Sequence, residues 1–172
     1  QTGFWTPELF MYRQYGVTPD IVIVGKGMSA GLHPLSGIIY RRELDVMAQY
    51  DAISTNGNAA LAALVALANI ELLQRNAAQV VEAQEYYYHR LCGLAAEFSG
   101  RIAAVHGNRS MTGLKFHKVE DALTFHKRCV AGGLWLRVHA YHPGHSTILC
   151  KFALCLERAV VDEFIRRLRI FL

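Results

Sequence analysis

The chain has 172 residues, of which 52% are hydrophobic and 19% charged, a composition that indicates a folded globular protein and excludes a disordered tract. A membrane helix needs roughly 18 uninterrupted apolar residues, and Asn69 and Glu71 interrupt the most apolar segment. The formal net charge is +4, yet the basic residues are scattered except for Arg166, Arg167 and Arg169, which we interpret as a solvated helix face. We therefore expect neither a membrane nor a nucleic acid as a partner.

The first residues, Gln1-Thr2-Gly3-Phe4-Trp5, contain neither a basic start nor an apolar signal core, so nothing argues for export and we expect a cytoplasmic protein. The chain also lacks a starting Met, which predicts a processed protein or a piece of a larger one. Its four cysteines form no CxxC pair and are expected to be reduced and structural. These residues are Cys92, Cys129, Cys150 and Cys155.

Two apolar runs near the start predict strands. The run Asp20-Ile21-Val22-Ile23-Val24 is rich in β-branched residues and ends at Gly25, which is typical of a parallel strand covered on both faces in an α/β fold. The run Ser36-Gly37-Ile38-Ile39-Tyr40 follows a loop that contains glycine and proline. Lys26 is therefore expected in the loop between two strands.

Helical spacing of apolar residues predicts one helix at about 58–74, well buried through Leu61, Leu64 and Leu72, and a second at 80–98. After Gly100 the pattern changes to short strand candidates interleaved with helices, which indicates a small α+β domain. We place the boundary between residues 1–76 and 77–172. The expected strands are 102–105, 111–116, 134–138 and 147–152, and the expected helices are about 120–131 and 158–171.

Lys26 is the candidate nucleophile. It follows a predicted strand and stands between Gly25 and Gly27, so its backbone is free of side-chain crowding. A lysine held in a pocket that lowers its pKa can attack an aldehyde and form an imine, which is the resting linkage of pyridoxal phosphate (PLP) enzymes. Taken alone, a lysine at a strand end that reaches solvent is the alternative interpretation.

The surrounding sequence resembles class III aminotransferases. The run Tyr15-Gly16-Val17-Thr18-Pro19-Asp20 continues through the apolar strand to Gly25-Lys26-Gly27, and in that family a "YGV.PDI" stretch leads to the PLP lysine in "GK". Gln1-Thr2-Gly3-Phe4 resembles the end of the family's "DE-x-QTGFGRTG" block. The resemblance is strong over residues 1–75 and weak beyond them.

The resemblance implies an α/β fold in which residues 1–76 form the end of the PLP-transferase large domain, with a mostly parallel sheet and long helices. A small α+β C-terminal domain would follow at 77–172. It also implies a homodimer that uses PLP to transfer an amino group from an amino donor to a carbonyl acceptor. Lys26 would form the Schiff base and carry the proton, and Gln1 would lie beside the phenolic oxygen of the cofactor.

The segment Ser54-Thr55-Asn56-Gly57-Asn58 resembles the family's "TFGGN" turn, whose hydroxyl and backbone reach the phosphate of the PLP held by the neighbouring subunit. A hydroxyl followed by a turn and a helix start suits an anion in its own right, and an ordinary helix N-cap is the alternative. An alignment without gaps places Ser54 on the family's threonine, whereas Thr55 matches it better chemically. Both remain candidate phosphate ligands.

Two departures from the family affect the predicted chemistry. The carboxylate that keeps the pyridine nitrogen protonated lies in the family just upstream of the residue matched by Gln1, where this sequence begins. Near the family's carboxylate-clamping arginine the nearest cation is Lys151, which binds a carboxylate as a point charge. Lys151 is therefore a weaker candidate for substrate binding, and the identity of the substrate stays open.

Two other functions remain open at this point. A PLP-dependent racemase or epimerase would use the same Lys26, and a non-catalytic fragment or interaction module would lack the full cofactor site. The chain on its own is expected to be poorly soluble, because loss of the preceding half of the large domain would expose apolar faces at 21–24 and 61–72.

A series of histidines, His139, His142 and His145, has the spacing HxxHxxH. Proline and glycine between them argue against a regular helix, and no acidic or cysteine partner stands at ligand spacing. We therefore expect a solvent-facing loop here and no metal site.

Overall fold

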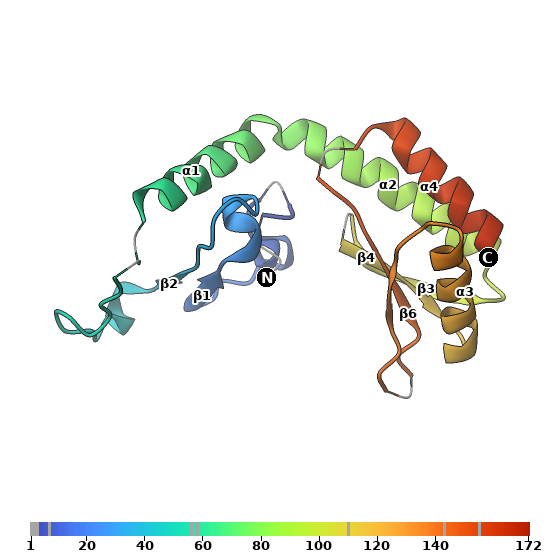
Figure 1. Ribbon diagram of the computed structural model, residues 1–172, viewed down its shortest axis with the longest axis horizontal. Coiled ribbons are helices and arrows are strands. Elements are labelled where there is room, and N and C mark those ends of the chain that lie inside the picture. Colours follow the sequence, from blue (N-terminus) through green and yellow to red (C-terminus); the bar gives the residue numbers. More distant parts are fainter. Residues whose placement is uncertain are drawn as a thin grey trace. The chain divides into compact units, whose positions relative to one another are not determined.

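The computed structural model describes residues 4–6, 8–55, 57, 59–109, 111–142, 144–154 and 156–172. The chain divides into two compact units, Gln1–Val80 and Val81–Leu172 (Figure 1). Within the described ranges, no helix is both long enough and apolar enough to cross a membrane.

The first unit contains two short strands, β1 (Ile21–Val24) and β2 (Gly37–Tyr40), which pair antiparallel with Ile21 opposite Tyr40. Both strands were predicted. β1 pairs antiparallel with β2, and a parallel neighbour that would bury β1 on both faces stays a prediction. Parallel strands need a long crossover, usually a helix, whereas these two are joined by a loop that holds only the 3-10 helix η2 (Lys26–Ser29). Ile23 is 72% exposed in this chain, so β1 is not covered on both faces.

Two further 3-10 helices, η1 (Met11–Tyr15) and η3 (Arg42–Leu44), flank this strand pair in the sequence. The unit is completed by α1 (Ala60–Arg75), whose many alanines and leucines favour a helix.

The buried face of α1 differs from the predicted one. Ala62, Ala66 and Leu73 are buried, whereas the predicted core residues Leu61 and Leu64 are 59% and 62% exposed. The spacing of the buried residues follows one stripe of the helix, and η2 contacts α1. The small alanine side chains allow this close approach, so the leucines lie elsewhere on the helix surface.

The second unit places helices against one antiparallel sheet, in the strand order β3-β4-β6-β5 (Figure 1). Every predicted element is present, although the strand expected at 134–138 begins only at 137. Its elements are α2 (Ala77–Glu97, which starts in the first unit), β3 (Ile102–Asn108), β4 (Met111–Phe116), α3 (Val119–Ala131), β5 (Arg137–His139), β6 (Thr147–Lys151) and α4 (Arg158–Phe171).

The late start of β5 has a local cause. Gly133 adopts a φ of 76° after α3, a left-handed conformation that glycine takes without steric cost. The N–H of Leu134 then donates to the carbonyl of Cys129 over 2.7 Å. This turn satisfies a carbonyl at the helix end and uses the residues that would otherwise extend the strand.

Alternation along the strands explains the core of the second unit. Leu114 and Phe116 of β4 and Ile148 of β6 are buried, and they belong to one hydrophobic cluster with Leu91 of α2 and Ile165 of α4. Because successive strand residues point to opposite faces, one face of the sheet packs on the helices and the other carries the remaining side chains.

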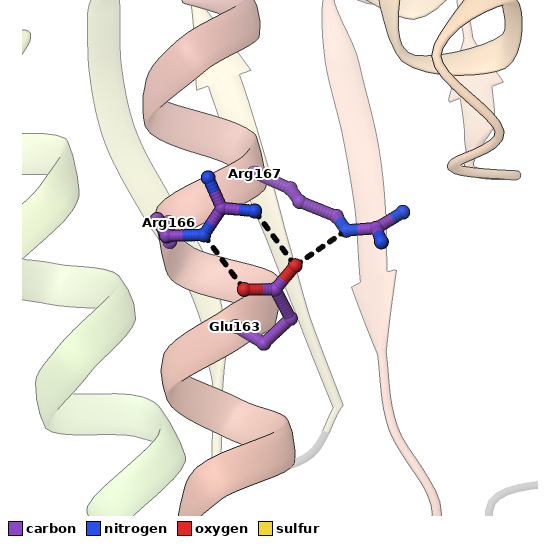
Figure 2. A network of polar contacts seen from close by, with 3 residues as sticks. All are labelled: Glu163, Arg166 and Arg167. Atoms are coloured by element: carbon purple, nitrogen blue, oxygen red, sulfur yellow. Dashed lines mark hydrogen bonds and ion pairs between the residues drawn. The ribbon is translucent and has the colours of Figure 1, made fainter.

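Charged side chains line the outer surface of α4, as the sequence predicted for its arginines. Figure 2 shows the carboxylate of Glu163 accepting hydrogen bonds from Arg166 at 2.7 and 2.8 Å and from Arg167 at 2.8 Å. These two guanidinium groups lower the pKa of Glu163 to about 2. Arg169 pairs with Glu97 of α2 at 2.8 Å.

Candidate active site

An open pocket of about 640 Å³ lies in the first unit, where η2, the loop before β2 and the approach to α1 meet. Its size falls in the range of ligand-binding pockets. The residues that line it are Lys26, Ser29, Gly31, His33, Pro34, Leu35, Ser36, Ser54, Gly57, Ala59 and Ala62.

Lys26 begins η2 directly after β1 and lies in this pocket, as predicted for the loop between the two strands. Its φ is 45°, in the left-handed region that non-glycine residues rarely adopt. Strained backbone of this kind is found at functional sites when the surrounding structure holds it in place. The Lys26 side chain is exposed in this chain, so the described residues do not enclose it.

Two side chains fix the turn that follows Lys26. Nδ2 of Asn69 on α1 donates to the carbonyls of Gly27 at 2.9 Å and Met28 at 3.1 Å. The hydroxyl of Ser29, which is 2% exposed, donates to the carbonyl of His33 at 2.5 Å. The sequence interpretation missed both residues. No local signal marked Asn69, because the face of α1 that the sequence predicted to be buried ran through Leu61, Leu64 and Leu72.

Ser54 and Thr55 are both exposed, and Ser54 is among the described residues that line the pocket of Lys26 whereas Thr55 is not. The N–H of Gly57 donates to the carbonyl of Ser54 at 3.3 Å. A Cβ at position 57 would lie 2.9 Å from the Cβ of Ser54, which is too close, so the turn favours glycine at this position. The N-cap of α1 is Ala59, without a side-chain hydrogen bond, so neither Ser54 nor Thr55 is the N-cap residue, and Asn56 and Asn58 of the same segment lie outside the described residues. Gln1 lies outside the described residues.

Lys151 lies in the second unit, at the end of β6. It lines a hollow of about 180 Å³ with Met111, Leu149 and His106. Residues that pair across strands share one face of a sheet. Lys151 pairs with Met111, and Leu149 pairs with Gly113, which also pairs with His106. These residues therefore lie on one face. This is the face opposite the core.

Basic groups gather on that face. By the same register it also carries Lys115, Arg137 and His139, which pair with Thr147 or Leu149. The sequences of the four strands contain no acidic residue. The surroundings of Lys151 are therefore electropositive and partly apolar, which suits a small carboxylate.

His142 and His145 are exposed and lie in the loop after β5, as the sequence predicted. The prediction of a solvent-facing loop was wrong for His139, which is half-buried and is the last residue of β5. The N–H of His145 donates to the carbonyl of His142 at 3.0 Å, which closes a turn. In the described part of the chain, no three His, Cys, Asp or Glu residues are grouped so that they could hold a metal ion.

The pocket of Lys26 offers groups that fit two ends of PLP. The primary amine of Lys26 matches the aldehyde. The Ser54 hydroxyl beside a glycine turn suits a phosphate, which by the resemblance would belong to the cofactor of a neighbouring subunit. None of the described lining residues is an acid that could pair with the pyridine nitrogen. The pocket therefore suits the aldehyde of the cofactor and leaves its ring nitrogen to groups outside this lining.

Comparisons with known proteins agree with these features. The ornithine aminotransferase of Oceanobacillus iheyensis is 31% identical over 122 residues, which are 69% of this chain and 30% of that protein. The putrescine aminotransferase of Pectobacterium atrosepticum is 30% identical over 133 residues, 74% of this chain and 28% of that protein. The chain thus spans less than a third of these two relatives.

The fold is also that of known structures. The ornithine aminotransferase of Toxoplasma gondii superimposes with a TM-score of 0.82 and 21% identity, over 99% of this chain and 41% of that one. This likeness confirms the predicted fold, the C-terminal portion of a PLP-transferase. The family model described as "Aminotransferase class-III" matches residues 1–172, beyond the 1–75 over which the motifs are clear, and enzymes of this family use PLP. The chain therefore belongs to the class III aminotransferases.

Proposed function

We propose that the protein containing this chain transfers an amino group from an amino donor to a carbonyl acceptor with PLP as its cofactor, and that Lys26 is the residue that holds PLP. The observation that carries the proposal is the placement of Lys26, on a left-handed turn at the end of β1 and in an open pocket of about 640 Å³. Membership of the class III family supports it.

Each candidate residue has a proposed task. Lys26 would bind the aldehyde carbon of PLP through Nζ and later move a proton at the substrate α-carbon, as a general acid and base. Ser54, or Thr55 beside it, would donate to the phosphate, and Gln1 would meet the phenolic oxygen. When bound, PLP supplies the electron sink for carbanion chemistry.

Lys151 is proposed to attract the carboxylate of a substrate. The hollow beside it and the basic face of its sheet support this role. A lysine provides charge without the two-pronged geometry of arginine, so we expect weak selectivity for the orientation of the carboxylate. Two of the relatives are named for ornithine and putrescine, so amines with a terminal primary amino group are the first donors to test.

The domain assignment and the assembly are also proposals. We assign residues 1–76 to the large cofactor domain and 77–172 to the small domain, which is supported by the compact units Gln1–Val80 and Val81–Leu172. We further propose a homodimer with the phosphate site shared between subunits, and a cytoplasmic location. The free thiols of Cys92, Cys129 and Cys150 support a reducing compartment.

The test is a transamination assay on the full-length protein with PLP, ornithine or putrescine as donor, and pyruvate or 2-oxoglutarate as acceptor. Lys26→Ala should abolish formation of the new amino acid, whereas Lys127→Ala on the exposed surface of α3 should leave the rate unchanged. Chiral analysis of a single amino acid under the same conditions separates transfer from racemisation. Full activity of Lys26→Ala would refute the proposal.

A further inference from the structure

The side chain of Asn69 connects the long helix of the first unit to the turn that carries Lys26. It is half-buried and lies on α1 on the same stripe as the buried residues Ala62, Ala66 and Leu73. A polar side chain on an inward stripe is unfavourable unless it forms hydrogen bonds. Asn69 forms two with one nitrogen, to the carbonyls of Gly27 and Met28.

These two carbonyls belong to the residues directly after Lys26. The turn itself is closed by two backbone hydrogen bonds between residues three positions apart. The N–H of Met28 donates to the carbonyl of Gly25, and the N–H of Ala30 donates to the carbonyl of Gly27, each at 3.1 Å. Such a single turn is weakly stable by itself, since few bonds compensate for the ordering of its residues. The bonds from Asn69 attach it to a 16-residue helix.

We propose that Asn69 is a positioning residue that holds the backbone of Lys26 in its left-handed conformation and so aims its amine at the cofactor. The inference rests on the proposed function, because it takes Lys26 as the lysine that binds PLP. The φ of 45° at Lys26 is unfavourable for a residue with a Cβ, and the two bonds from Asn69 stabilise the turn that contains this conformation. Asn69 acts through Lys26 and needs no contact with a substrate.

The amide suits this task better than similar side chains do. Aspartate has the same shape but no N–H donor, and its charge would repel both carbonyls. Leucine has a similar size but leaves the carbonyls of Gly27 and Met28 without this donor. Asn69→Asp and Asn69→Leu therefore remove the two bonds in different ways and should have the same effect on Lys26.

Asn76 provides a matched control on the same helix. Its Nδ2 donates to the carbonyl of Leu72 at 2.7 Å, so Asn76→Leu also removes an amide-to-carbonyl hydrogen bond. This bond lies at the C-terminal end of α1 and does not involve the turn after Lys26. All variants are made in the full-length protein that contains this chain, and thermal unfolding is measured for each variant to check that it folds.

The readout is the labelling of Lys26 rather than catalysis. PLP is added, the bond between its aldehyde carbon and Nζ is reduced by borohydride to a secondary amine, and the peptide with Lys26 is quantified by mass. Labelling with formaldehyde and borohydride is measured in parallel, because this small aldehyde requires no orientation. We expect PLP labelling of Lys26 to fall about tenfold in both Asn69 variants while formaldehyde labelling changes less than twofold, with Asn76→Leu unchanged in both.

Equal PLP labelling in the parent and in the Asn69 variants would overturn the inference, and so would an equal fall for both aldehydes. If PLP does not label Lys26 in the parent, the proposed function fails instead. Hydrogen exchange in the parent gives a test that needs no variant: slow exchange of the Met28 and Ala30 amides supports a held turn, and exchange at the rate of an open loop contradicts it.

Discussion

Removing the hydroxyl of Tyr87 should destabilise the second unit by a predictable amount. The Tyr87 hydroxyl is buried and donates to the carbonyl of Cys150 at 2.7 Å, and it lies 3.1 Å from the hydroxyl of Thr112. Thr112 donates to the same carbonyl at 2.7 Å. The Cys150 carbonyl thus receives two side-chain donors, and either one remains when the other is removed.

The magnitudes follow from this sharing. Tyr87→Phe keeps the ring contact with Phe152, at 4.8 Å between centroids, so it removes one hydrogen bond without a cavity and should cost about 1 kcal/mol. Thr112→Val should cost a similar amount. The double variant leaves the buried carbonyl without both donors, so its cost should exceed the sum of the single costs by about 1 kcal/mol.

The assay is urea unfolding of the full chain, followed by circular dichroism. Burial raises the pKa of Tyr87 well above its ordinary value, so the phenol stays neutral and the effect should be constant from about pH 6 to 9. Tyr86→Phe is the control, since Tyr86 bonds to Asp162 at 2.8 Å in a half-buried position and its loss should cost less. Strictly additive single effects would refute the shared-carbonyl reasoning.

Three other predictions concern charge, ligand binding and solubility. Arginine neighbours lower the pKa of Glu163 from 4.5 to about 2, so its contribution to stability is present above about pH 4.5 and is lost as the pH falls towards 2; thermal unfolding of the parent and of Glu163→Gln should differ at neutral pH and converge near pH 2. Lys151→Gln should raise KM for a carboxylate-bearing substrate about tenfold with little change in kcat, whereas Lys127→Gln should change neither, as measured by initial rates. Leu64 is 62% exposed, so Leu64→Lys should reduce self-association of the isolated chain in analytical ultracentrifugation; a parent chain that is already monomeric and cooperatively folded would contradict this.

Much of the second unit could be predicted from the sequence because its elements are amphipathic and locally determined. The strand predicted at 111–116 and the helix at 158–171 have the bounds observed for β4 and α4. Thr112, Leu114 and Phe116 are buried at every second position of β4, and Val161, Ile165 and Leu168 of α4 point inward, which explains this agreement. The start of β5 was missed because a glycine turn, rather than hydrophobicity, decides where that strand begins.

The first unit was harder to predict because its apolar residues are not all used within this chain. The sequence correctly predicted β1, β2 and the position of Lys26 between them, since punctuation by glycine is a local signal. It could not show that β1 pairs antiparallel or that Leu61 and Leu64 stay exposed, since both depend on which neighbours are present. Asn69 was overlooked because its partners, Gly27 and Met28, are 42 and 41 positions away in the sequence.

The most direct test of the central claim is an absorbance spectrum of the full-length protein with PLP, before and after borohydride reduction, for the parent and for Lys26→Ala. We predict a visible band for the parent that borohydride removes, and PLP mass on the peptide that contains Lys26. The band and the added mass should both be absent in Lys26→Ala. A folded parent protein that forms no such band, or that carries PLP on another lysine, would contradict the assignment of Lys26.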